Sequence, residues 1–146
     1  MPEPYRRLLV HHGDMTSRLE AFHRSTIILE VLHREQSARN YRREVVLHAE
    51  QSGLPVEYGA IEINLDAFEP RIRPAILEAH LPLGGLLNRF GVQYRSEPQA
   101  FIRLDPDATM DGVFGVFHAP RFYGRSNLLL GADDQVLARI VEVLRP

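Results

Sequence analysis

Alternation of apolar and polar residues, repeated in segments that short turns separate, is the feature that most restricts the fold of this chain. Such alternation predicts strands, because successive side chains of a strand point to opposite faces of a sheet. Turns are expected at residues 51–55, 105–107 and 131–134, and residues 114–118 fit either a strand or a loop. We expect strands at residues 25–34, 41–49, 56–64, 92–94, 100–104, 121–130 and 136–144.

Two regions show helical spacing instead. Residues 14–23 place apolar side chains at helical intervals behind Asp14, a favoured helix cap. Residues 66–90 predict a helix that breaks at Pro82 and is followed by a short helix at residues 84–89. Strands joined by short turns, with helices in two places, indicate the α+β class, an antiparallel sheet with helices packed on one side. The length of 146 residues predicts a single domain, 1–146.

Composition excludes several classes of function. The 17 basic and 19 acidic residues are interspersed, so no nucleic-acid or anionic-membrane surface is predicted. The absence of cysteine excludes disulfides, thiolate metal sites and cysteine nucleophiles. Seven scattered histidines lack the spacing of a zinc motif, and we predict no metal. No segment has the length of a membrane span or the pattern of a signal peptide, which predicts a cytoplasmic protein.

Two charged residues fall on strand faces that are otherwise apolar. Residues of equal parity share a face of a strand, so each of these charges is expected to point toward the core. Arg43 shares its face with Tyr41, Val45 and Leu47. Glu142 interrupts a stripe formed by Val136, Ala138, Ile140 and Leu144.

A lone buried ion costs several kcal/mol, so each of these groups needs an opposite charge, hydrogen bonds or a ligand. One interpretation is a structural ion pair between Arg43 and Glu142. The other makes Arg43 a clamp for a substrate carboxylate and Glu142 a polar group in a dry pocket. Burial would raise the pKa of Glu142 and a nearby Arg43 would lower it, and parity does not decide between these effects.

Several short motifs occur in an order and spacing that resemble a known enzyme family. They lie at residues 8–9, 15–20, 41–47, 82–84, 123–126 and 141–146. Together they resemble chorismate lyase, which releases pyruvate from chorismate to make 4-hydroxybenzoate. The resemblance implies an antiparallel sheet flanked by helices, an enclosed pocket covered by helical flaps, and neither metal nor organic cofactor.

The resemblance also implies roles for individual residues. Arg43 would bind the ring carboxylate, helped by the backbone amides of Met15 and Leu83. Glu142 would lie near the ring hydroxyl, and we expect it to assist proton transfer, so that Glu142 and Arg43 are the catalytic residues of a carbon–oxygen lyase. From its charge alone, and not from the resemblance, Arg125 is a candidate to neutralise the enolpyruvyl carboxylate, and the alternative is a solvated strand arginine.

Two further functions stay open. One is an enzyme of the same fold that acts on another cyclic or aromatic acid. The other is a non-catalytic ligand-binding domain, since effector domains of some bacterial transcription regulators share this fold. Such domains usually follow a winged-helix domain, and this chain begins a few residues before its first motif, which we take to disfavour a regulator. We expect a monomer whose partner is a small carboxylic acid.

Overall fold

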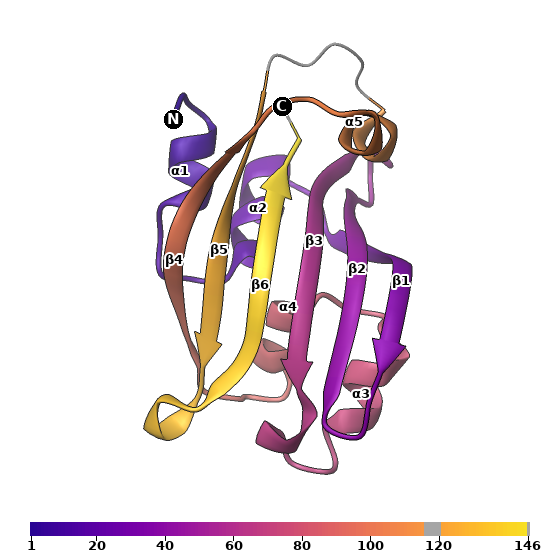
Figure 1. Cartoon of the computed structure of the whole chain (residues 1–146), viewed down its shortest axis with the longest axis vertical. Coiled ribbons are helices and arrows are strands. Elements are labelled where there is room, and N and C mark those ends of the chain that lie inside the picture. The colour runs from indigo at the N-terminus through magenta and orange to yellow at the C-terminus, as the bar shows by residue number, and fades with distance from the viewer. Residues whose placement is uncertain (116–120, 146) are drawn as a thin grey trace.

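The computed structural model describes residues 1–115 and 121–145, and its centre is a six-stranded antiparallel sheet (Figure 1). This confirms the predicted α+β class. Two three-stranded halves meet where β3 pairs with β6, although these two strands are far apart in the sequence. Across the sheet, the strands are β1 (Ile27–Gln36), β2 (Asn40–Ala49), β3 (Pro55–Asn64), β6 (Val136–Leu144), β5 (Phe122–Leu130) and β4 (Arg95–Leu104).

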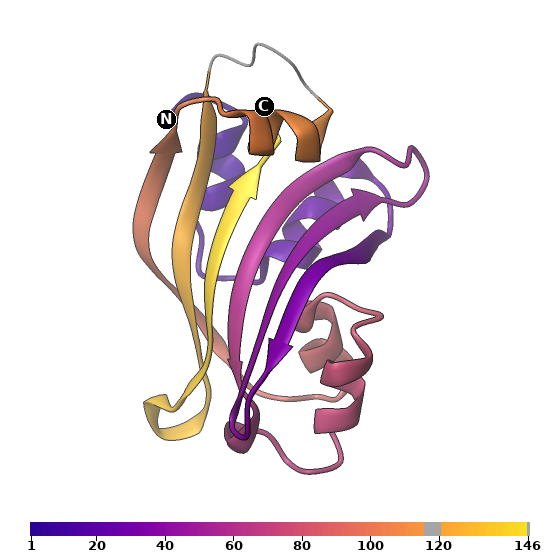
Figure 2. The ribbon, with the colours of Figure 1, turned by 45° about the vertical axis from the view of Figure 1, so that its right-hand side comes forward.

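The helices cover both faces of the sheet unequally (Figure 2). Helix α5 (Ala108–Phe114) packs on the opposite face from the other four, so the expectation of helices on one side is wrong for this helix. Residues 105–107, expected to form a turn, lead directly into this helix. The Asp107 side chain caps α5 by accepting a hydrogen bond from the Met110 amide at 2.8 Å. The other helices are α1 (Tyr5–Leu9), α2 (Met15–His23), α3 (Arg73–Glu78) and α4 (Leu83–Arg89), with 3-10 turns η1 (Leu65–Ala67) and η2 (Ala132–Asp134).

Helix α2 is the predicted helix. The Asp14 side chain caps it by accepting a hydrogen bond from the Ser17 amide at 2.7 Å, and Arg24 ends it in the left-handed conformation. The longer helix predicted within residues 66–90 is instead η1 and α3, because Pro70 and Pro74 delay helix formation until residue 73. Helix α4 then begins directly after Pro82.

Strand β4 also differs from the prediction of two separate strands. Residues 92–94 are not in a strand, and residues 95–104 form one strand with an irregularity between Pro98 and Ala100. Polar residues and a proline are tolerated here because β4 lies at the edge of the sheet. Of the ambiguous stretch 114–118, Phe114 ends α5, and residues 116–118 lie outside the described part of the chain.

Two apolar clusters fill the space between the sheet and α1–α4. One joins α3 and α4 to the sheet, and the other joins α1 and α2 to β1, β2 and β3. A third cluster lies under α5 on the opposite face, where Phe114 stacks on Phe122. No helix of the described residues is both long enough and apolar enough to span a membrane.

Candidate functional site

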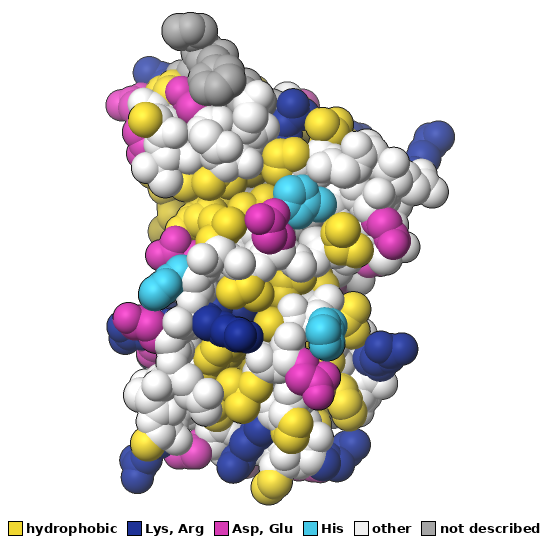
Figure 3. All heavy atoms as spheres, turned by 90° about the vertical axis from the view of Figure 1, so that its right-hand side faces the viewer, with side chains coloured by type: hydrophobic (Ala, Val, Ile, Leu, Met, Phe, Trp, Pro, Cys, Tyr) yellow, Lys and Arg dark blue, Asp and Glu magenta, His cyan; other side chains and the backbone are white. Residues whose placement is uncertain are grey.

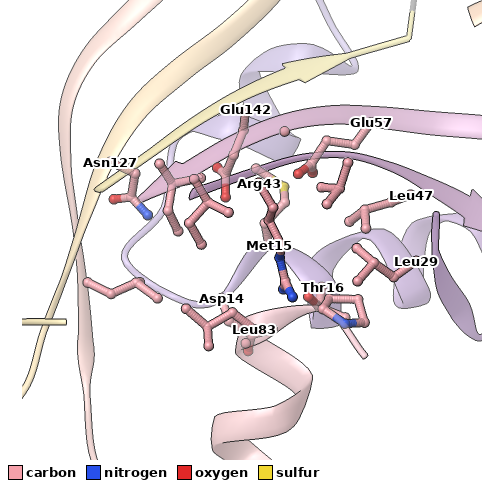
Figure 4. Close-up of a pocket in the computed structure, with 17 residues that line it drawn as sticks. Asp14, Met15, Thr16, Leu29, Arg43, Leu47, Glu57, Leu83, Asn127 and Glu142 are labelled. Carbon is pink, nitrogen blue, oxygen red and sulfur yellow. The ribbon is translucent and has the colours of Figure 1, made fainter. Parts of the chain in front are cut away.

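A cavity lies between the two larger apolar clusters, where the sheet meets the first residues of α2 and α4 (Figure 4). Its volume, counted as space open to the centre of a water molecule, is about 60 Å³. This is several times what a single water needs, so the cavity has room for a small molecule. Its sheet wall is mainly apolar, and it contains four polar side chains, namely Arg43, Glu57, Asn127 and Glu142.

The register of the sheet brings these side chains together, because residues directly opposite on neighbouring strands share a face. Arg43 belongs to a row that continues through Ile61 and Ile140 to Asn127. In the next row, Gly59 is opposite Glu142, which is opposite Arg125. Glu57 lies one row further along, opposite Leu47 and Leu144. The cavity therefore receives polar groups from three successive rows of four strands.

Arg125 is completely buried and is paired with Glu142. Its Nε donates to Glu142 Oε2 at 2.7 Å, and its Nη1 donates to the carbonyls of Leu9 and His11, each at 3.0 Å, whereas its Nη2 has no partner among the described residues. Burial raises the pKa of Glu142, and the Arg125 guanidinium opposes that rise. Glu142 is thus paired with Arg125 and not with Arg43, which was one of the two interpretations of the sequence, and Arg125 is buried and not solvated.

Arg43 is buried without an acidic partner. Its guanidinium reaches the Ile76 carbonyl at 3.4 Å and lies 5.8 Å from the centre of the Tyr41 ring, while its Nε has no partner among the described residues. Burial lowers its pKa, although arginine remains charged in proteins. Figure 4 shows this side chain extending from the sheet toward Met15 and Thr16, so its charge lies at the helix side of the cavity.

The helix side of the cavity is formed by the first residues of α2 and α4. Asp14, Met15 and Thr16 line it from α2, and Pro82, Leu83 and Gly84 line it from α4. The two helices come close together because Gly84 has no side chain, since a Cβ there would lie 3.3 Å from the Asp14 Cβ. Met15 and Leu83, which the resemblance named, both line the cavity together with Arg43.

Glu57 is a site residue that the sequence analysis missed. It lines the cavity, only 4% of it is exposed, and its Oε2 has no hydrogen-bond partner among the described residues. Burial raises its pKa well above the usual range, and the neighbouring Glu142 adds to the rise. The same parity rule that identified Glu142 would have found it, because Glu57 shares its strand face with Ile61 and Ile63.

Arg125, which its charge had made a candidate for binding the substrate, is not among the residues that line the cavity. Asn127 does line the cavity, although the sequence analysis did not consider it. Its side-chain amide donates a hydrogen bond to Ser96 Oγ at 2.8 Å. No cluster of acidic and histidine side chains suited to a metal ion occurs in residues 1–115 and 121–145.

The solved structures that share this fold include domains of transcriptional regulators. The effector domain of PhnF from Mycobacterium smegmatis matches with a TM-score of 0.69 at 14% identity, over 91% of this chain and 88% of that one. The longer PhnF structure matches with a TM-score of 0.70 at 13% identity, over 93% of this chain but only 65% of its own length. No protein-family model and no curated protein matches the sequence.

A third match is the ligand-binding domain of a protein from Bordetella bronchiseptica assigned to the GntR family of transcriptional regulators. Its TM-score is 0.61 at 10% identity, over 83% of each chain. These likenesses support the fold that the sequence resemblance implied. They do not show that this chain belongs to the chorismate lyase family.

The prediction of an enzyme, a carbon–oxygen lyase, is contradicted. The structures that match include the effector domain of PhnF and the ligand-binding domain of a protein assigned to the GntR family of transcriptional regulators.

Proposed function

We propose that this chain is a non-catalytic domain that binds a small organic acid in the cavity between the sheet and the starts of α2 and α4. The observation that carries the proposal is the buried guanidinium of Arg43, which has no acidic partner among the described residues. An uncompensated buried charge is costly, and a ligand carboxylate would remove that cost. The planar fork of arginine suits two parallel hydrogen bonds to such a group.

A carboxylate suits the cavity better than a doubly charged anion. Arg43 is the one cation among the residues that line the cavity, and Asp14 and Glu142 lie on the same lining. Glu142 is paired with Arg125, and Asp14 adds a further negative charge to the lining, so a ligand with two negative charges would be repelled more strongly than a ligand with one. The effector and ligand-binding domains that share this fold support a binding role.

The side of the surface on which β1 lies does not favour a competing role in binding nucleic acid. Figure 3 shows, on the side where β1 lies, acidic and basic side chains interspersed with apolar ones. No large region of a single charge is visible on that side. A nucleic-acid surface would instead gather Lys and Arg along one face.

The test is calorimetric titration of the protein with benzoate and its 3- and 4-hydroxy derivatives. Arg43→Met should weaken binding by about 2 to 5 kcal/mol, because it removes one partner of a buried charge pair. The matched control is Arg42→Met, since Arg42 is exposed on the other face and paired with Glu62. Equal losses in the two variants, or no binding of any of these acids by the natural protein, would refute the proposal.

A further inference from the structure

The second polar region of the cavity is formed by two carboxyl groups, of which Glu142 is bound to an arginine. Glu142 and Glu57 lie in successive rows of the sheet, and Arg125 lies in the row of Glu142. Figure 4 shows the Glu57 and Glu142 carboxyl groups close to the sheet, while the Arg43 guanidinium extends away from it. The cavity thus has an anion-binding end and a separate carboxyl end.

Counting the charges that face Glu57 indicates its protonation state. Arg125 binds Glu142 directly at 2.7 Å, and this pair is already neutral. Arg43 lies at the helix side of the cavity, beside Asp14 and Thr16. An ionised Glu57 would therefore add a buried negative charge next to Glu142, and burial and repulsion both oppose this by raising its pKa.

A protonated Glu57 needs an acceptor for its hydrogen. No described residue supplies a hydrogen bond to Glu57 Oε2, and its neighbours across the strands, Leu47 and Leu144, are apolar. A buried hydroxyl without a partner costs about 1 to 3 kcal/mol, and a ligand that accepts its hydrogen would recover part of this cost.

Gly59 lies beside Glu57 in the cavity lining, and the absence of its side chain keeps the carboxyl group uncovered. A Cβ at this position would lie 3.7 Å from Glu57 Oε1 and only 3.2 Å from Val45 Cγ2. Any larger residue at position 59 would therefore crowd the carboxyl group and the apolar wall. Gly59 and Glu57 line the same cavity as Arg43.

We infer that Glu57 is a second ligand-binding residue, which acts as a neutral acid and donates a hydrogen bond to an uncharged oxygen of the ligand. The inference rests on the proposed function and narrows it. The ligand would be a small acid with a carboxylate for Arg43 and a hydroxyl, ether or carbonyl oxygen for Glu57. A ligand with an ammonium group at that end would instead require an ionised Glu57.

The test compares benzoate with 3- and 4-hydroxybenzoate in the natural protein, in Glu57→Gln and in Glu57→Leu. The natural protein should prefer one of the hydroxy acids by roughly tenfold, the value of one hydrogen bond. Glu57→Gln keeps a neutral donor and should keep the preference, whereas Glu57→Leu should lose it and still bind benzoate. Benzoate binding that depends on Arg43, without any preference for a hydroxyl, would overturn the inference and leave the proposed function standing.

A measurement without ligand tests the protonation state independently. The infrared spectrum at pH 7 should contain a carbonyl band of a protonated carboxyl group that disappears in Glu57→Gln. Tighter binding of 4-(aminomethyl)benzoate than of the hydroxy acids, with its loss in Glu57→Gln, would show an ionised Glu57. Either that result or a missing infrared band would overturn the inference, whatever the outcome for Arg43.

Discussion

Arg43 and Arg125 are both buried on the helix-covered face of the same sheet, but they differ in what surrounds their charge. Arg125 binds a carboxylate and two backbone carbonyls, whereas Arg43 has one long hydrogen bond to a carbonyl and no acidic partner among the described residues. Arg125 is also absent from the cavity lining, and Arg43 is part of it. Burial alone therefore does not distinguish these two charges, and the presence or absence of a bound carboxylate does.

The largest expected effect that sharpens this comparison is on folding. Arg125→Met should lower the free energy of unfolding by about 3 to 5 kcal/mol, because it leaves Glu142 buried without its cation. Urea unfolding followed by circular dichroism measures this loss. The double variant Arg125→Met with Glu142→Gln should recover much of the loss, and a double variant as unstable as the single one would show that the pair is not the cause.

The next effect concerns Glu57, a buried carboxyl group whose Oε2 has no hydrogen-bond partner among the described residues. Its folded pKa is raised above the unfolded value of about 4.3, so the folded state keeps a proton that the unfolded state releases. Stability from this group is complete below that pH and is lost as the pH rises toward the folded pKa. The slope within this window is about 1.4 kcal/mol per pH unit.

Glu57→Gln should remove this slope. As the pH rises, the free energy of unfolding of the natural protein should therefore fall relative to that of the variant. Urea unfolding at a series of pH values measures the difference. Glu62→Gln is a matched control on the same strand, because Glu62 faces the other side and pairs with Arg42. Parallel pH profiles for the natural protein and Glu57→Gln would contradict a raised pKa.

The smallest expected effect could break the comparison. Arg43→Met should change the free energy of unfolding by less than about 1 kcal/mol, because no buried carboxylate is left without a partner. Thermal unfolding without ligand measures this. A loss as large as that of Arg125→Met would mean that Arg43 is also a structural ion and would remove the reason to assign it a ligand.

The parity of residues in the strands was enough to find two of the polar residues of the cavity. Arg43 and Glu142 were predicted to lie on apolar faces, and both are buried. The same rule applied to Val56–Asn64 would have added Glu57. It could not have paired the charges correctly, because it shows only which face a residue occupies.

Strand alternation and turn residues in the sequence determined the class of the fold and placed most strands and helix α2, because these patterns act over a few residues. Only the tertiary structure decided which charges meet. Glu142 lies opposite Arg125 because β6 pairs with both β3 and β5, and Arg43 is left without an acid because its row contains Ile61 and Ile140. Strand order and register depend on contacts between distant segments, and the energy of a buried charge depends on those contacts.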